Sequence, residues 1–468
     1  MNDPLDTQLN ALEQQQLIRF LASESELAYR FQHVLTQDTA YNSLLVRRRR
    51  VLHREIATVL EHADDITPAA RAPLLAYHYW QAEEWQSAGE WAMRAGEQAM
   101  QVYALREAIT EFERAMQAFE SAPSATPAQY IDAILAWSQA AFNFRPRAEI
   151  LERVLVAESL SREINDKARL VSSLDAAANV NLAQGYPSRA LPALRQIYDL
   201  AQELGDERLL VAPAFNLGIY AMDNEPQAAL AYLDRALELS RRYNDRDIEA
   251  YTLGTQGMIL ARMGKFEEAE RASRAAFALL DQIRSPLTES DIYLFAGWLN
   301  LDEGKAEDAL AFGQQGLQKA IAVDNMECVC YGFACVGFGN LQVQQLPEAI
   351  AAFQESIHRS QYSGAAHIEL LARVGLAVSE IFGGKREALD DLETAFADAQ
   401  AMKQTYVAAL AAQSLGMIYL QLGDYARAKE RLLYAREFFE SKGLRPALER
   451  TQNLLAQLSE AQAANVQT

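Results

Sequence analysis

Three Gly-Lys pairs are the residues of this chain that could bind a phosphate group. They are Gly264-Lys265, Gly304-Lys305 and Gly384-Lys385. A Walker-type loop needs an earlier glycine, five positions before the glycine that precedes the lysine, and a serine or threonine after the lysine. The residues that follow the lysines here are Phe266, Ala306 and Arg386. We therefore interpret the pairs as turns of a sequence repeat, and the sequence predicts neither a nucleotide site nor a cofactor.

Three cysteines, Cys328, Cys330 and Cys335, could bind a metal ion. They fall on one expected helix, where residues two apart point in different directions. Because no histidine lies close to them in the sequence to complete a tetrahedral site, we interpret them as small buried residues.

The sequence also lacks a Ser-His-Asp signature, an HExxH motif and paired carboxylates. We expect no catalytic residue and no metal site, so the chain is not expected to be an enzyme.

A dense basic cluster could bind phosphate groups or an acidic protein surface. It consists of Arg47, Arg48, Arg49, Arg50 and Arg54. One interpretation is a nucleic-acid or localisation patch. The other is the solvated flank of an amphipathic helix, or a face that docks on an acidic neighbouring domain. His53, which lies among apolar residues of the same helix, is expected to be a packed structural histidine.

Charge and composition restrict the possible partners. The chain has 468 residues and a net charge of −20, which repels nucleic-acid phosphates and anionic lipids. Nucleic-acid and membrane binding are therefore not expected. Three cysteines fit a reducing compartment, and the first residues lack the basic and apolar regions of a signal peptide. The sequence predicts a cytoplasmic protein.

The elements that position these residues follow a repeat marked by alanine. After the first pair, the alanines recur every 39 to 42 residues, at positions Ala88, Ala108, Ala148, Ala190, Ala229, Ala269, Ala309, Ala349, Ala388 and Ala428. Such a period predicts a solenoid, in which each unit buries its apolar face against its neighbours. In the last clear unit, small residues at Gly416 and Ala428 flank a Gly423-Asp424 helix break and let two antiparallel helices approach closely.

The pattern of small residue, turn glycine and two alanines resembles the tetratricopeptide repeat (TPR). The resemblance covers about residues 130–458 and implies an all-α fold, a right-handed α-solenoid of helical hairpins. The TPR period is 34 residues, so the period of about 40 found here implies hairpins longer by about 8–9 Å if both helices share the extra residues. Long TPR hairpins of this kind are similar to those of large bacterial signalling ATPases.

The N-terminal region differs from the repeats. Two apolar runs, Leu17–Leu21 and Leu27–Phe31, predict a β-hairpin, and one long amphipathic helix is expected after them. The string YRFQHVLTQDTAYNSLLVRRRRVLHREIATVLE resembles the winged-helix module that precedes the TPR array in signal-transduction ATPases, including cyclase-associated and LuxR-type regulators. We expect a winged-helix-like remnant at 1–62, a helical lead-in at 63–120, a linker at 121–129, the repeat array at 130–458 and a polar tail at 459–468.

One stripe of large side chains could bind a partner. The first helix of each pair lines the concave face of a TPR array, and its inward positions here include Phe215, Met222, Tyr251, Met258, Trp298, Tyr331 and Phe338. These residues either line a groove for a peptide or protein, or are buried between the repeats of a tightly wound superhelix.

Three functions remain open from the sequence. The first is a non-catalytic sensor or scaffold module that binds a protein, a peptide or a small effector through its concave face. The second is the regulatory fragment of a larger STAND-type ATPase or nucleotide cyclase. The third is a DNA-binding regulator, which the net charge of −20 disfavours.

Overall fold

The computed structural model describes residues 4–22, 27–63, 66–184, 186–223, 225–283 and 285–467. The chain forms two compact units. Unit 1 contains residues 1–101 and 107–133, and unit 2 contains residues 102–106 and 134–468. The segment boundaries that the sequence predicts after residues 62, 120 and 129 therefore all fall inside unit 1.

The described part of unit 1 begins with a helix and a two-stranded antiparallel hairpin, in which Ile18 pairs with Phe31. Its elements are α1 (Pro4–Gln14), β1 (Ile18–Ala22), β2 (Leu27–Phe31), α2 (Val34–Ser43), α3 (Val46–Glu61), α4 (Pro68–Ala82), α5 (Trp85–Gln101), α6 (Leu105–Ser121) and the first turns of α7 (Pro127–Ala141). The expected hairpin is confirmed, although residues 23–26 between its strands lie outside the described residues.

The prediction of a single long helix after the hairpin is wrong. Leu44 and Leu45 adopt extended backbone conformations, with ψ of 136° and 141°, and they separate α2 from α3. The linker expected at 121–129 is also shorter than predicted, because α6 ends at Ser121 and α7 begins at Pro127. Apolar periodicity continues across such a break, so the sequence pattern alone did not locate it.

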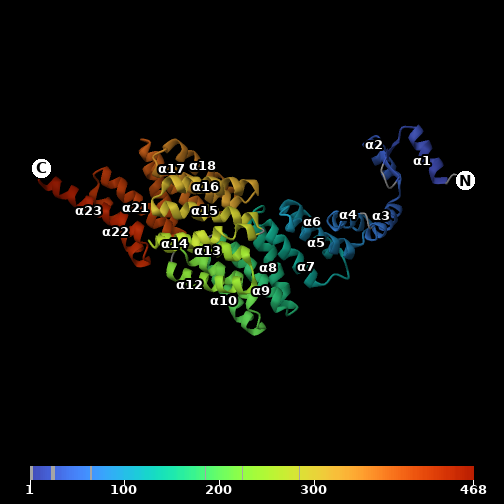
Figure 1. The fold of residues 1–468 in the computed structure, drawn as a ribbon, viewed down its shortest axis with the longest axis horizontal. Helices are drawn as coiled ribbons and strands as arrows, with labels where there is room; N and C mark the ends of the chain where they lie inside the picture. Colours follow the sequence, from blue (N-terminus) through green and yellow to red (C-terminus); the bar gives the residue numbers. More distant parts are fainter. Residues whose placement is uncertain are drawn as a thin grey trace. The chain divides into compact units, whose positions relative to one another are not determined.

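Unit 2 is a stack of antiparallel helical hairpins (Figure 1). After α7, its elements are α8 (Arg147–Glu163), α9 (Lys167–Ala183), α10 (Pro187–Leu204), η1 (Glu207–Leu210), α11 (Val211–Ala221), α12 (Pro226–Tyr243), α13 (Arg246–Arg262), α14 (Phe266–Phe277), η2 (Leu280–Gln282), α15 (Pro286–Glu303), α16 (Ala306–Ala322), α17 (Met326–Gln342), α18 (Leu346–Ser363), α19 (Ala366–Phe382), α20 (Ala388–Ala401), α21 (Thr405–Gln421), α22 (Tyr425–Lys442) and α23 (Arg445–Gln467). Residues 459–467 continue α23, so the separate polar tail is not observed.

The repeat alanines lie where the two helices of a hairpin touch. From Ala190 to Ala428, each alanine of the series is fully buried. A Cβ atom added at Gly416 would come within 2.5 Å of Leu432 and 3.3 Å of the Ala428 carbonyl oxygen. The equivalent Gly218 has the same relationship to Leu233. Small residues at these positions therefore set the close approach of the helices, as the sequence predicts.

Ala148 is the exception in the series. Its side chain is exposed, and the buried residues of this part of α8 are Arg147, Ile150 and Val154. The assignment of Ala148 to the buried position is therefore wrong. An arginine faces inward one residue before the predicted alanine, at the start of α8.

The Gly-Lys pairs lie in turns between helices, as predicted. The glycines adopt left-handed conformations that a side chain would strain, with φ of 73° at Gly264, 77° at Gly304 and 96° at Gly384. The Nζ atoms of Lys305 and Lys385 form surface ion pairs, with Glu270 and with Glu380, each at 2.9 Å. These lysines therefore neutralise acidic neighbours on the surface of the array.

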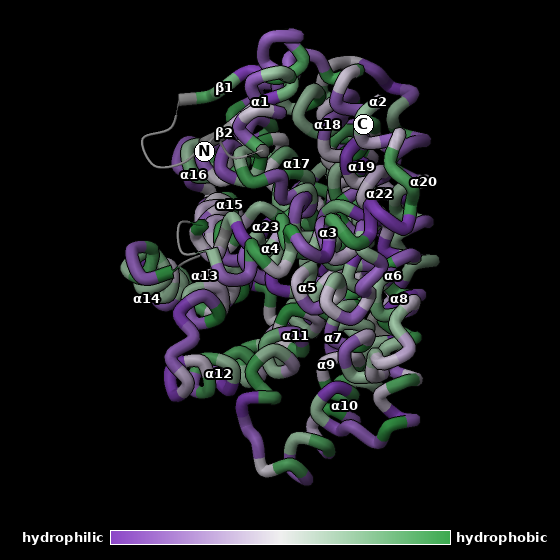
Figure 2. The backbone as a smooth tube through the Cα atoms, turned by 90° about the vertical axis from the view of Figure 1, so that its right-hand side faces the viewer, coloured by the Kyte–Doolittle hydropathy of each residue, from purple (hydrophilic) through white to green (hydrophobic). Residues whose placement is uncertain are grey.

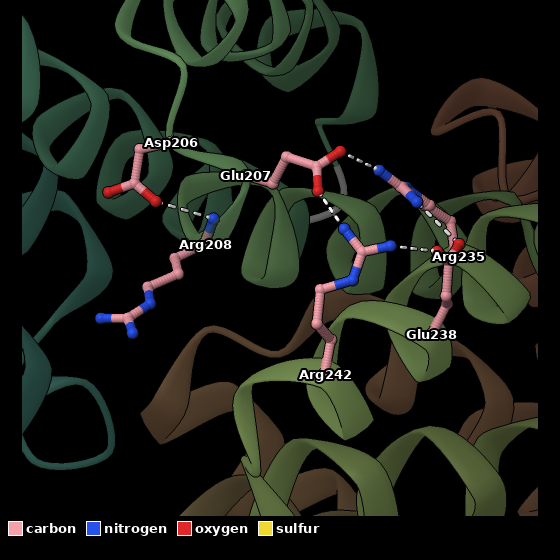
Figure 3. A network of polar contacts seen from close by, with 6 residues as sticks. All are labelled: Asp206, Glu207, Arg208, Arg235, Glu238 and Arg242. Carbon is pink, nitrogen blue, oxygen red and sulfur yellow. Dashed lines mark hydrogen bonds and ion pairs between the residues drawn. The ribbon is translucent and has the colours of Figure 1, made fainter.

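A surface network of charges holds the short helix η1 against α12 (Figure 3). Glu207 accepts hydrogen bonds from Arg235, at 2.8 Å, and from Arg242. Glu238 pairs with the same two arginines, at 2.6 and 2.7 Å. Asp206 caps η1 by accepting a hydrogen bond from the backbone N–H of Arg208 at 3.0 Å. Exposed pairs contribute little individually, and such a network mainly fixes the position of η1.

Along the tube of Figure 2, hydrophilic and hydrophobic residues alternate within the helices. This alternation places apolar side chains between neighbouring helices and charged ones on the outside. Among the described residues, no helix is both long and apolar enough to cross a membrane.

Candidate functional site inside the helical array

The structure brings most of the sequence-predicted stripe together. The first helices of successive pairs, α13, α15, α17 and α19, pack against one another. Phe215 lies 4.8 Å from Tyr251 between ring centres, and Trp298 stacks on Tyr331 at 4.8 Å and touches Phe338 at 5.8 Å. The hydroxyl of Tyr331 also lies 3.4 Å from the sulfur of Met258 on α13. Met222, just after α11, packs against the same core cluster as Tyr251.

The stripe is largely closed to solvent. Phe215, Met258 and Trp298 are 7%, 1% and 8% exposed, so the interpretation that they line an open groove is wrong. Met222, Tyr251, Tyr331 and Phe338 are half-buried. The alternative of a tightly wound superhelix holds for the three buried side chains.

These side chains are buried because they belong to the core clusters between the helices of unit 2, and two further contacts join distant repeats of this unit. Arg147 at the start of α8 donates to Glu327 of α17 at 2.9 Å, across 180 residues of chain. The side-chain amide of Gln227 donates to the backbone carbonyl of Lys442 at 3.4 Å, across 215 residues. These contacts join α8 to α17 and α12 to α22, helices that lie far apart in the sequence.

A buried ion cluster lies among these inner helices. Arg262, at the end of α13, is 6% exposed and pairs with Asp223 at 2.6 Å and with Asp302 at 3.8 Å. Its guanidinium also stands 4.6 Å from the centre of the Tyr406 ring on α21. Burial opposes the charged form, but Tyr406, Asp223 and the other acidic groups nearby hold the pKa of Arg262 above its ordinary value. Sequence reasoning missed this residue, although an arginine within the apolar run GMILARM was an available signal.

Nε1 of Trp298 and Nε of Arg262 are buried, and neither has a hydrogen-bond partner among the described residues. The nearest acid to the Arg262 Nε is Asp302, at 3.8 Å. A buried donor without an acceptor costs about 1–3 kcal/mol relative to a satisfied one. Both atoms lie inside the helical stack and not on its accessible surface.

The three cysteines are buried and unpaired with one another. The thiol of Cys328 donates to Asp291 at 2.6 Å, and Asn325 contributes a second contact to its sulfur at 3.0 Å. Burial raises the pKa of Asp291 to about 7, against the hydrogen bond from Cys328. The prediction of small buried cysteines is confirmed. In the described part of the chain, no group of three or more histidine, cysteine or acidic side chains is arranged to hold a metal ion.

The basic cluster lies in unit 1, on α3. Arg50 and Arg54 form ion pairs with Glu83 and Glu84, at the turn between α4 and α5. Arg49 lies 4.9 Å from the centre of the Tyr41 ring and donates to Asn42 at 3.4 Å. Within the described residues, Arg47 and Arg48 are exposed without an ion pair. Part of the cluster thus binds acidic residues of its own unit.

His53 is packed between α3 and α4, as predicted. It is 6% exposed, and its Nε2 lies 3.0 Å from the Tyr41 hydroxyl. Its Nδ1 lies 2.9 Å from Nδ1 of His78, so a single proton lies between the two rings. Burial lowers the pKa of both histidines, with a further contribution from Arg49 at His53 and from His53 at His78.

A family comparison agrees with the geometry of the hairpins. Residues 213–282, from α11 to η2, match the tetratricopeptide repeat family. The fold is TPR-like. Most helices of the TPR-like hairpins have 17 or 18 residues, such as α15 and α16, whereas α11 and α14 have 11 and 12. No curated protein matches the sequence as a relative.

Two solved structures are similar to this chain, and the first of them supports the same architecture. The Rap conjugation gene regulator of plasmid pLS20, in complex with the Phr* peptide, has a TM-score of 0.51 at 14% identity and covers 70% of this chain and 95% of its own. A STAND protein with a TPR sensor from Pyrococcus horikoshii has a TM-score of 0.47 at 14% identity over 86% of this chain. This chain spans 59% of the length of that STAND protein. At 14% identity, the likeness to the Rap regulator shows the fold alone.

Proposed function

We propose that the chain is a non-catalytic sensor or scaffold module that binds a peptide or protein segment on its inner face. The observation that carries this proposal is the row of half-buried rings of Tyr251, Tyr331 and Phe338, which keep part of their surface accessible on the inner face. A peptide presents apolar side chains that pack on such rings. A small apolar effector packs on the same rings.

The arrangement favours a binding role over catalysis. The inner face holds arginine, aspartate, tyrosine and methionine side chains that already contact one another, as in the Arg262–Asp223 pair. The peptide complex of the Rap regulator offers a precedent for peptide binding by this fold. We place the protein in the cytoplasm, since its free cysteines suit a reducing compartment.

The test is capture of an arrayed library of random 15-residue peptides by the full chain. Phe338→Leu keeps an apolar side chain and removes the ring, so we expect peptides captured by the wild type to bind about tenfold more weakly. Tyr362→Leu, at an 81% exposed ring at the end of α18, is the control and should bind as the wild type does. The proposal is wrong if the wild type captures no peptide saturably, or if Phe338→Leu and Tyr331→Leu both leave capture unchanged.

A second candidate is the regulatory fragment of a larger STAND-type ATPase or cyclase. Large apolar side chains of unit 1 favour it: Leu35 is 80% exposed, Leu45 79% and Val59 70%. A further domain, which would meet the winged-helix-like segment, would cover such residues. An upstream coding frame that enters a P-loop domain would support this candidate, and a stop codon immediately upstream would exclude it. The DNA-binding alternative is weakened because Arg50 and Arg54 already pair with glutamates.

A further inference from the structure

A stripe of apolar side chains on α3 is left uncovered in unit 1. The α3 stripe consists of Leu45, Leu52, Ile56 and Val59, and spacings of 7, 4 and 3 residues place the four on one face of the helix. Leu45, Ile56 and Val59 are exposed, and Leu52 is half-buried. Helix α3 packs on α4 by a different face, which buries His53 and Ala57. Among the described elements, α4 is the only one that contacts α3 extensively, and it leaves the stripe accessible.

Helix α1, in the same unit, has an apolar face of matching size. Leu5, Leu9 and Leu12 recur at spacings of 4 and 3 residues, so they share one side of the helix. Leu5 and Leu12 are exposed, and Leu9 is half-buried. At 11 residues, α1 is about 16 Å long, and it fits within the roughly 21 Å that separate Leu45 from Val59 along α3.

The charges beside the two faces are opposite. Helix α1 contains two acids, Asp6 and Glu13, and no basic residue, and each acid lies one helical turn from Leu9. On α3, Arg48 lies one turn after Leu45, is exposed and forms no ion pair with the described residues. Glu55 borders the far end of the stripe. Charge therefore directs an acidic helix to the end near Leu45, where the dipole of α3 adds partial positive charge.

We propose that α1 of one copy of the chain docks on the α3 stripe of a second copy, in a dimer with two-fold symmetry. Each copy supplies one acidic α1 and one basic stripe, so the same contact forms twice. The leucines of α1 pack on the stripe and supply the affinity, and the acids beside them face Arg48 and set the orientation. The inner face of unit 2 takes no part, so this inference does not rest on the proposed function.

The first test measures self-association of the full chain by sedimentation velocity over a series of protein concentrations. The wild type should form a dimer that dissociates on dilution, because two short helix contacts make a small interface. Leu45→Asp places a charge on the stripe and should raise the dissociation constant at least about tenfold. Aspartate suits the N-cap position of α3, so this variant should keep its helix, which circular dichroism checks. Val102→Asp, at a similarly exposed apolar residue in a turn, is the control and should associate as the wild type does.

Charge exchange tests which segments meet. Asp6→Arg and Arg48→Glu should each weaken association of the single variant, because a like-charge pair replaces the attraction. An equimolar mixture of the two variants should associate about as tightly as the wild type. In the mixed dimer, one contact carries both substitutions, with opposite charges, and the other contact carries neither.

Hydrogen exchange provides a further readout, because exchange at residues 4–14 and 45–59 should slow together as the protein concentration rises. A chain that stays monomeric at every concentration would overturn the proposal, whether its own α1, a further domain or another protein covers the stripe. A dimer that Leu45→Asp leaves intact would overturn it too, as would a mixture of Asp6→Arg and Arg48→Glu that associates no better than either variant alone. None of these results bears on peptide capture by unit 2, so failure here is distinct from failure of the proposed function.

Discussion

Arg147 and Glu327 form an ion pair of 2.9 Å between residues 180 positions apart, and the arginine side chain is 4% exposed. The pair joins α8, near the start of unit 2, to α17. A buried cation of this kind needs its partner, because removal of the acid leaves an uncompensated charge.

The Arg147–Glu327 ion pair should therefore matter for stability. We expect Glu327→Gln to lower the free energy of unfolding by about 1.5–3 kcal/mol, the range for a hydrogen bond to a charged group. Urea unfolding of unit 2, followed by circular dichroism, measures the change. Adding Arg147→Met to the same chain should recover part of the loss, since no buried charge then remains. The exposed Lys167–Glu203 pair is the control: Glu203→Gln should change stability by less than about 0.5 kcal/mol.

Trp298 should contribute to the core of the array. Because its ring is 8% exposed and packs on Tyr331 and Phe338, we expect Trp298→Ala to cost about 3–5 kcal/mol. Thermal melting measures this cost, and Tyr362→Ala, at an 81% exposed ring, should leave the melting temperature nearly unchanged. A melting curve for Trp298→Ala that overlays the wild type would mean that the ring is not packed as the structure shows.

Acid should destabilise the contact between α3 and α4. The folded chain lowers the pKa of His53 and His78 below their ordinary 6.5, so the unfolded state binds more protons as the pH falls through that value. The contribution of the two neutral histidines to the free energy of unfolding is therefore present above about pH 6.5 and is lost progressively below that pH. Hydrogen exchange of residues 46–82 at pH 7.5 and pH 5.5 measures the loss. The variant His53→Gln should show a smaller difference between the two pH values than the wild type.

Asp291 should give the opposite pH dependence. Its folded pKa of about 7 lies above the ordinary 3.8, so the fold favours the protonated acid, and the stability it provides is lost as the pH rises toward and through 7. We expect Asp291→Asn, which cannot ionise, to be more stable than the wild type at pH 8 and to lose that advantage at pH 5. Melting temperatures at the two pH values test this, and an equal difference at both would contradict the assignment of a raised pKa to Asp291.

The repeat could be predicted from the sequence because its determinants are local. Gly218 and Gly416 approach Leu233 and Leu432 identically, and the alanines between Ala190 and Ala428 are all buried. Each of these contacts joins residues of one hairpin, so helical periodicity and turn glycines suffice to locate them. The same locality explains why the Gly-Lys pairs were correctly interpreted as turns.

The winding of the superhelix was decided only by the tertiary structure. Arg147 lies beside Ala148, which the period had marked as buried, and nothing near Arg147 in the sequence points to Glu327. The guanidinium of Arg262 lies over the ring of Tyr406, and the sequence near Arg262 does not indicate this contact either. Trp298 is buried instead of lining an open groove. Contacts across one superhelical turn depend on small rotations that add up over several repeats, and no local spacing records that sum. The sequence alone therefore determined the helical hairpins and their order, whereas the tertiary structure decided which of their side chains remain accessible to a partner.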